Sequence, residues 1–340
     1  MLQRLLVTVA LGLAAALVVA PVIGCSSEPE VKEKPRAWSI VQEGVEAGVL
    51  MAATNLPDGT PLVVGGQSDL GAAFRLVTGK LVAETVPAGQ LLSWASVGAD
   101  GHVLVVGNGK RALWRDPAGA WTSETLPAGD KLWGCLAFGK DDAYAVGADE
   151  TSKDDYAPVL LRRTAGGWSQ VTLPELPKER QNVQLFKVDG HSSKDILVVG
   201  DVGTALHYDG ATWTAEATGT GENLVTVRKL GVDRYVVVGG TASGFLRTRE
   251  ADGSWKVVRE TMVGLSGVDL FDDKAIVSGS YGWIEEIDLA KGTSVELDDL
   301  LTSDVLHFVL RLPNGDALSG GGNLQAWPGP MQGTLLGWVR

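Results

Sequence analysis

Short apolar runs that each end in a glycine recur along the whole chain. Each run contains two or three small or branched residues, and successive glycines lie 39 to 42 residues apart except for one gap of 53. Short apolar runs bounded by turn residues are typical of buried strands. The seven runs occupy residues 63–65, 105–107, 145–147, 198–200, 237–239, 277–279 and 318–320.

A turn signal lies just upstream of every run, so that each run is expected to be the second strand of a hairpin. Downstream, several copies show a third strand, a second turn and a tryptophan that opens a fourth strand, as at Trp121, Trp168, Trp213 and Trp255. The repeated unit is therefore four short strands. The upstream turn pairs are Asp58-Gly59, Asp100-Gly101, Asp141-Asp142, Lys194-Asp195, Val232-Asp233, Asp272-Asp273 and Asn314-Gly315.

Four-stranded units at this period, with no helical pattern between them, predict an all-β fold: a seven-bladed β-propeller of four-stranded antiparallel blades. The tryptophan of each outer strand is expected to pack between adjacent blades. Residues 36–44 align with residues 211–219, so the N-terminal segment is predicted to supply the outer strand of the last blade. The alternative for that place is the C-terminal segment 334–339.

The run 198–213 resembles the repeat of bacterial YCF48-like and BNR-like propellers, and the weaker copies extend the resemblance over nearly all of residues 36–340. The likeness to Kelch repeats is more distant. WD40 repeats match poorly because their combination of Gly-His and Trp-Asp does not recur from copy to copy, and Gly-His occurs only at Gly101-His102 and Gly190-His191. The resemblance implies binding or assembly on a rigid ring and says nothing about which partner.

The N-terminal residues predict an export signal, because Arg4 precedes an apolar stretch over residues 5–20. The tetrad Val22-Ile23-Gly24-Cys25 resembles the lipobox of bacterial lipoproteins, which implies cleavage after residue 24 and a lipid on Cys25. We therefore expect a signal peptide at 1–24, a lipidated cysteine and flexible tether at 25–35, and the propeller at 36–340. Ser26 favours the outer membrane of a bacterial envelope. The alternative is an uncleaved membrane helix over residues 5–23.

Charge and cysteine content narrow the possible partners. The formal net charge of −12 disfavours nucleic acid, because binding a polyanion begins from clustered Lys and Arg. Cys135 lies in an apolar run and is expected to be buried and structural. No cofactor is expected, and the four histidines fall at different positions of their repeats, so no metal site is predicted. The longer third copy places an acidic insertion at residues 148–158, interpreted as a solvated loop in preference to a calcium site.

Because the loops after the glycines emerge on one face near the channel, that face is the predicted binding surface. Trp283 is one candidate for this surface, but it could instead open a strand. We expect a monomeric, non-catalytic binding or scaffolding module for a protein or glycan partner. The alternatives are a glycan-active hydrolase or lyase, with cations from Arg75, Arg111, Arg162, Arg228 and Arg311, and a purely structural surface lipoprotein. The candidate ligand-binding residues are Asp69, Lys110, Arg111, Asp201, Tyr281, Trp283 and Asn323.

Overall fold

The computed structural model describes residues 37–339, except for 154, 297–299 and 325–330. The predicted signal peptide, Cys25 and the tether lie outside the described residues. Within the described part of the chain, no helix is long and apolar enough to cross a membrane.

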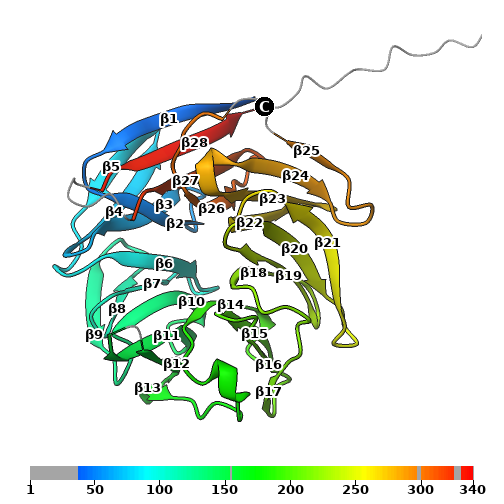
Figure 1. The fold of residues 1–340 in the computed structure, drawn as a ribbon. Coiled ribbons are helices and arrows are strands. Elements are labelled where there is room, and N and C mark those ends of the chain that lie inside the picture. Colours follow the sequence, from blue (N-terminus) through cyan, green and yellow to red (C-terminus); the bar gives the residue numbers. More distant parts are fainter. Residues whose placement is uncertain (1–36, 154, 297–299, 325–330, 340) are drawn as a thin grey trace, which may run out of the picture. The chain divides into compact units, whose positions relative to one another are not determined.

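The described residues form seven four-stranded antiparallel sheets that follow one another around a ring, which confirms the predicted propeller (Figure 1). We name the sheets blades A to G. Two short 3-10 helices, η1 (Lys178–Arg180) and η2 (Ser280–Gly282), lie between strands. The strands are β1 (Ala37–Val45), β26 (Leu306–Arg311), β27 (Ala317–Gly322) and β28 (Gly333–Val339) in blade A; β2 (Val49–Asn55), β3 (Pro61–Gln67), β4 (Leu70–Val77) and β5 (Lys80–Glu84) in B; β6 (Leu92–Val97), β7 (Val103–Gly107), β8 (Arg111–Arg115) and β9 (Trp121–Thr125) in C; β10 (Lys131–Gly139), β11 (Asp142–Ser152), β12 (Asp155–Thr164) and β13 (Gly167–Gln170) in D; β14 (Leu185–Ser192), β15 (Asp195–Gly200), β16 (Ala205–Tyr208) and β17 (Trp213–Ala215) in E; β18 (Leu224–Gly231), β19 (Arg234–Gly240), β20 (Gly244–Arg249) and β21 (Trp255–Thr261) in F; and β22 (Leu265–Phe271), β23 (Lys274–Gly279), β24 (Ile284–Asp288) and β25 (Ser294–Glu296) in G.

Both ends of the propeller contribute to blade A, in the order β1-β28-β27-β26. The N-terminal strand is the outer one, as predicted, and the C-terminal strand is the third rather than the outer strand. Trp38 on β1 lies opposite Trp338 on β28, and their rings stack with centroids 6.0 Å apart. Pairing the N-terminal strand with the C-terminal one covers the edge that β28 would otherwise expose.

The innermost strand of every blade carries a β-bulge at the same position. A buried leucine pairs with the glycine of the apolar run, and the next residue on the inner strand has no partner, as at Leu50, Met51 and Gly65. The same irregularity follows Leu92, Leu132, Leu185, Leu224, Leu265 and Leu306.

The bulge explains why each run ends in glycine. A Cβ on Gly65 would lie 1.9 Å from the carbonyl oxygen of Val49, and one on Gly107 would lie 2.0 Å from that of Leu91. The bulged backbone approaches too closely for any side chain at these positions. In the last copy the partner of Leu306 is Gly321, one residue beyond the glycine that the sequence pattern indicated.

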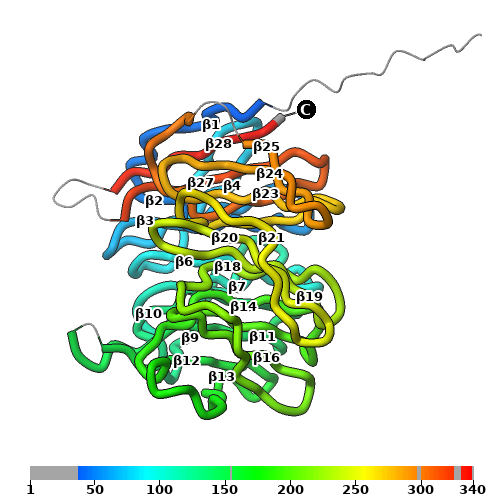
Figure 2. The backbone as a smooth tube through the Cα atoms, turned by 45° about the vertical axis from the view of Figure 1, so that its right-hand side comes forward, coloured from blue at the N-terminus to red at the C-terminus, as the bar shows by residue number. Residues whose placement is uncertain are grey.

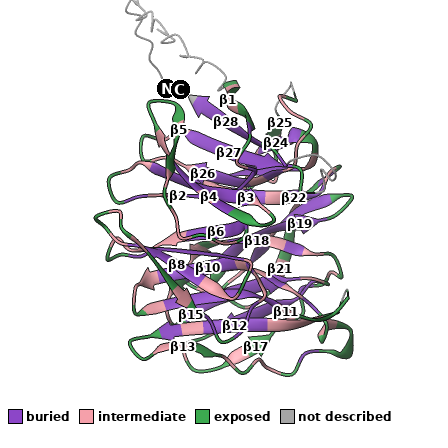
Figure 3. Ribbon diagram, turned by 90° about the vertical axis from the view of Figure 1, so that its left-hand side faces the viewer, coloured by how far each residue is buried: buried purple, intermediate pink, exposed green. Residues whose placement is uncertain are grey.

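Adjacent blades pack through buried apolar clusters, and burial is concentrated on the inner three strands (Figure 3). The tryptophans of the outer strands reach the preceding blade as predicted. Trp121 and Trp168 donate to Glu84 and Glu124 of the preceding outer strands, both at 2.8 Å.

The third copy differs from the prediction of an inserted loop. Residues 148–152 and 155–158 continue the strand pairing as a long β11–β12 hairpin, which extends beyond the neighbouring loops (Figure 2). Part of the extra length lies elsewhere, in the connection of residues 171–184 between β13 and β14, which contains η1. The two strands pair without a shift in register as far as Glu150 and Tyr156, so the insertion lengthens the hairpin instead of forming a loop.

Candidate functional site

Two cavities occupy the central channel and share no lining residue. Because every blade starts its inner strand on the same side, one channel end lies among the loops that follow the glycines, and we call this side the post-glycine face. The other end lies among the turns between the first and second strands, the hairpin face. The hairpin-face cavity has a volume of about 250 Å³ and the post-glycine cavity about 190 Å³.

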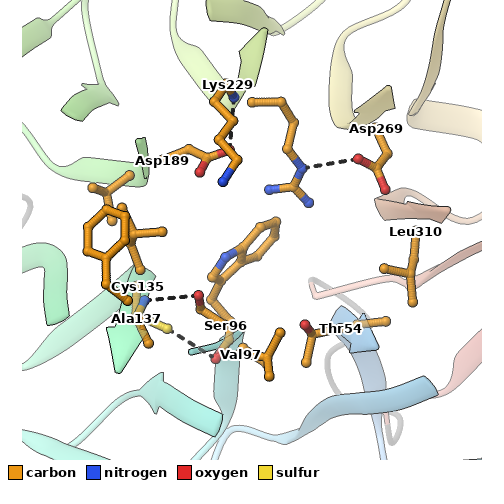
Figure 4. A pocket seen from close by; sticks show the side chains of 16 residues that line it. Thr54, Ser96, Val97, Cys135, Ala137, Asp189, Lys229, Asp269 and Leu310 are labelled. Carbon is orange, nitrogen blue, oxygen red and sulfur yellow. Dashed lines mark hydrogen bonds and ion pairs between the residues drawn. The ribbon is translucent and has the colours of Figure 1, made fainter. Parts of the chain in front are cut away.

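The hairpin-face cavity has one charged wall (Figure 4). Asp189, Arg228 and Asp269 occupy equivalent positions on the inner strands of three consecutive blades, and Arg228 Nε lies 3.6 Å from Asp269 Oδ1. The Asp189 carboxylate accepts from the backbone N–H of Lys229, and that of Asp269 from the N–H of Arg311. Each carboxylate therefore connects its blade to the next one. Burial raises the pKa of Asp269, although the Arg228 guanidinium opposes the shift.

The opposite wall of this cavity is made of small and apolar side chains from blades B, C, D and A (Figure 4). Ser96 accepts a hydrogen bond from the N–H of Ala137 at 3.0 Å, which joins blades C and D. The polar groups of this cavity are thus largely engaged in holding inner strands together.

The post-glycine cavity is lined by the bulge residues. Six of the seven unpaired bulge positions face it, because a bulge turns its extra side chain out of the sheet and into the channel. Asn223, Lys187 and Leu324 complete the lining. The six bulge residues are Met51, Trp133, Phe186, Val225, Ser266 and His307.

Trp94 and Lys187 lie between the two cavities. Trp94 is buried and lines the hairpin-face cavity, whereas Lys187 lines the other one, with Nζ 4.5 Å from the centre of the Trp94 ring. The Arg228 guanidinium carbon lies 5.1 Å from the same ring. Burial, with the neighbouring Arg228, lowers the pKa of Lys187 to about 7. Cys135 is fully buried beside this layer, as expected, and burial raises the pKa of its thiol.

The seven candidate binding residues all lie in or next to the post-glycine loops, but none of them lines the post-glycine cavity. Asp69, Tyr281 and Asn323 are exposed there. Tyr281 has a left-handed backbone with φ of 59°, which is uncommon for a residue other than glycine. These three side chains come from blades B, G and A and do not form one pocket with the other candidates.

Lys110 and Asp201 have structural partners. Lys110 lies 3.4 Å from Asp130 and 3.3 Å from Asp149 on the long hairpin. Asp149 also accepts from the backbone N–H groups of Gly129 and Asp130, and although burial alone would raise its pKa, these bonds and Lys110 hold it below its ordinary value. Asp201 accepts from the N–H of Gln184. Asp149 of the long hairpin is therefore paired with a lysine and with backbone groups.

Two further candidates make contacts within the propeller, and their assignment as binding residues stays a prediction. The Arg111 guanidinium donates to the backbone carbonyls of Pro87, Ala88 and Gln90 and fixes the loop before β6. Trp283 is half-buried against an apolar cluster between blades F and G, and its Nε1 donates to Glu285 at 3.3 Å. Trp283 therefore precedes a strand as a packing residue, which was the alternative interpretation.

Most residues of the post-glycine cavity lie on the first strands of the repeats, whereas the predicted binding residues lie in or next to the loops that follow the second strands. One sequence signal marks these strands: a leucine lies 14 or 15 residues before the glycine that ends each apolar run. The residue after each leucine then identifies the channel lining. Leucine is too common a residue for this pattern to stand out without the pairing register.

Asp195, His207 and Asp233 form a cluster whose ligand atoms lie within 4.8 Å of one another. His207 Nε2 is 3.3 Å from Asp195 Oδ1, and its Nδ1 is 3.2 Å from Arg249 Nη2. A guanidinium can only donate, so Nδ1 must accept and Nε2 must carry the proton. That tautomer leaves no lone pair on Nε2 for a metal ion. The cluster is therefore best explained as a hydrogen-bond network between blades E and F.

The arginines considered for a hydrolase or lyase site do not gather in one place. Arg75 pairs with Glu84, Arg162 lies 4.0 Å from Asp142, and Arg311 lies 3.4 Å from exposed Asp272. Neither channel cavity contains more than one of the five, since Arg228 alone lines the hairpin-face cavity. The two channel cavities therefore do not gather the arginines that the hydrolase or lyase alternative proposed as its cations.

Comparison with known proteins supports the fold and no more than the fold. No protein-family model matches the chain, and no curated protein has a matching sequence. Among solved structures, a streptogramin B lyase is similar with a TM-score of 0.68, 11% identity and coverage of 89% of this chain and 98% of that one. The WD40 repeats of RRP9 are similar with a TM-score of 0.67 and 11% identity, and the match covers 89% of this chain and 97% of that one. YCF48 from Cyanidioschyzon merolae is similar with a TM-score of 0.64 and 14% identity, and the match covers 89% of this chain and 98% of that one. This likeness is in line with the expected propeller resemblance.

Proposed function

We propose that this protein is a lipid-anchored protein of the bacterial cell envelope whose propeller binds a protein partner through its post-glycine face, without catalysis. The observation that carries this proposal is a set of large apolar side chains exposed on that face. Met262 is 87% exposed, Tyr281 64% and Leu70 53%, and Val202 adds to them. Several exposed apolar side chains on one face offer a surface that a protein partner can cover.

A protein partner is favoured over a glycan by the kind of side chain exposed. Sugar-binding surfaces commonly use flat aromatic rings, and one of the two aromatic candidates on this face, Trp283, is packed between blades. The remaining exposed groups are mainly aliphatic or thioether side chains, which suit the apolar core of a protein interface.

Non-catalytic binding is favoured over a glycan-active enzyme because the arginines are scattered and individually paired. The likeness to a streptogramin B lyase is at 11% identity and supports only the fold.

The partner surface can be tested by crosslinking in the native cell with the full chain as bait. Met262→Glu and Leu70→Glu place charges on the post-glycine face, and we expect each to reduce crosslinking of the partner at least about tenfold. Val232→Glu is the matched control, because Val232 is 60% exposed in a turn on the hairpin face. Equal loss in the control, or crosslinking to a second copy of the chain only, would contradict the proposal.

The anchor can be tested separately on Cys25, which lies outside the described residues. The wild-type chain should incorporate a labelled fatty acid and fractionate with membranes, and Cys25→Ser should do neither. Membrane fractionation that persists in Cys25→Ser without label would favour the uncleaved membrane helix instead.

A further inference from the structure

The post-glycine cavity contains a buried lysine without a counter-ion. Lys187 is 8% exposed, and its Nζ donates to the carbonyl oxygen of Trp133 at 2.7 Å. An ammonium has three donors, and the described residues supply this single acceptor besides the face of the Trp94 ring. No described carboxylate lies within ion-pair distance of Nζ, although the chain is strongly acidic overall. A buried cation is costly unless it is paired, so this site favours an anion.

The other polar groups of the cavity are neutral. His307 Nε2 lies 3.2 Å from the carbonyl oxygen of Gly322, so Nε2 carries the proton. Burial lowers the pKa of His307 to about 4, which keeps the ring uncharged near neutral pH. Asn223 and Ser266 offer amide and hydroxyl groups. One positive charge beside the neutral donors of Asn223 and Ser266 matches a single carboxylate better than a phosphate, which commonly gathers several cations or backbone N–H groups.

The walls and the size of the cavity define the rest of the ligand. Trp133, Phe186 and Val225 provide an apolar surface above the lysine. The volume of about 190 Å³ compares with about 150 Å³ for a protein cavity that holds benzene. The space therefore fits one ring or a short branched chain together with a small polar group.

We propose that the post-glycine end of the channel binds a small monocarboxylate with an apolar body, whose carboxylate pairs with the Lys187 ammonium. This inference goes beyond the proposed partner surface and does not depend on it, since the ligand occupies the channel and the partner contacts the exposed loops.

Phenylacetate is a suitable probe, with phenylacetamide as a neutral molecule of nearly the same shape. Titration calorimetry on the purified full chain should show phenylacetate binding at one site, and phenylacetamide at least about tenfold more weakly. Equal affinity for the two would overturn the role of the charge. The absence of saturable phenylacetate binding would overturn the proposal.

Lys187→Met tests the residue, because methionine removes the charge and keeps an unbranched apolar side chain. It should weaken phenylacetate binding at least about tenfold, whereas Lys229→Met should not, because the Lys229 side chain is exposed and engages through its backbone N–H only. Unchanged binding by a folded Lys187→Met chain would exclude the lysine. If the Lys187→Met chain fails to fold, the comparison of phenylacetate with phenylacetamide on the wild-type chain still tests whether the site prefers a negative charge.

The pH dependence gives a further readout. Binding should weaken as pH rises through about 7, because Lys187 then loses its proton. Two neighbouring groups keep their protonation state in that range, because burial keeps His307 neutral and the Cys135 thiol protonated. Affinity that is constant from pH 6 to pH 9 would contradict the lysine–carboxylate pair. The Met262→Glu variant should bind phenylacetate normally, so failure of this inference is distinguishable from failure of the partner surface.

Discussion

Three seams between blades use the same three residue types in the same arrangement. A glutamate on or just after one outer strand accepts from an arginine and a tryptophan of the next blade. Glu124 accepts two bonds from Arg163, at 3.0 and 3.1 Å, and one from Trp168 at 2.8 Å. Arginine suits this position because its planar fork matches a carboxylate while its face packs on a ring. The other two sets are Glu84, Arg115 and Trp121, and Glu216, Arg249 and Trp255.

These seams should make stability sensitive to acid. Burial would raise the pKa values of Glu84 and Glu124, but the bonds from arginine and tryptophan outweigh it and lower both below the ordinary 4.5. A lowered folded-state pKa means that the stabilisation is complete above pH 4.5 and is lost as pH falls below it. The Glu84→Gln, Glu124→Gln double variant should lose about 1–2 kcal/mol per seam at pH 7 and show a flatter acid limb. Urea unfolding from pH 3 to pH 7 measures both the stability at pH 7 and its loss in acid. If the stability of the double variant and that of the wild type fell in parallel with pH, the glutamates would not be the cause of the acid sensitivity.

Cys135 provides a second prediction about a single residue. Its thiol is buried beneath the channel layer, and burial raises its pKa, so very little thiolate is accessible to a reagent. In the Cys25→Ser chain, Cys135 should react with a thiol reagent at least about a hundredfold more slowly when native than in guanidinium chloride. Rapid labelling of the native chain, followed by absorbance, would show that the inner strands open readily.

At the scale of the strand, the glycine that ends each apolar run is required by backbone contact. In Gly107→Ala the new Cβ would lie 2.0 Å from the Leu91 carbonyl oxygen, and backbone cannot move away as a flexible side chain can. We expect a loss of about 2–3 kcal/mol in the free energy of unfolding. Gly231→Ala is the matched control, since nothing lies within 4 Å of a Cβ there, and it should change stability by less than about 0.5 kcal/mol. Equal losses in the two variants would show that the bulge is not the cause.

The same strands show what can be predicted from sequence. Turn pairs such as Asp58-Gly59 and the spaced glycines revealed the number of blades, because local backbone chemistry repeats in the sequence. The cavity could not be predicted, because the extra residue of a bulge appears only in the pairing register. The contacts of Arg111 could not be predicted for a similar reason: its carbonyl partners at 87–90 belong to the connection that leads into β6, and backbone acceptors carry no sequence signal.

At the scale of the whole propeller, closure depends on strand β1. It pairs along β28 from Ala37 to Val45 and places Trp38 on Trp338, which in turn lies 5.7 Å from the Phe271 ring of blade G. Removing residues 37–45 would expose the edge of β28 and one face of a buried tryptophan. We expect at least about 3 kcal/mol of lost stability together with self-association through the open edge.

Chemical denaturation and sedimentation velocity at several protein concentrations measure these two effects. Removal of residues 26–35 instead is the matched control, because it shortens the chain before β1 and leaves the strand intact. That control should unfold like the wild type and remain monomeric. If the chain without residues 37–45 also remained monomeric and equally stable, the seven-bladed ring would close through β26, β27 and β28 alone. The N-terminal strand would then serve only to connect the propeller to the segment that carries Cys25.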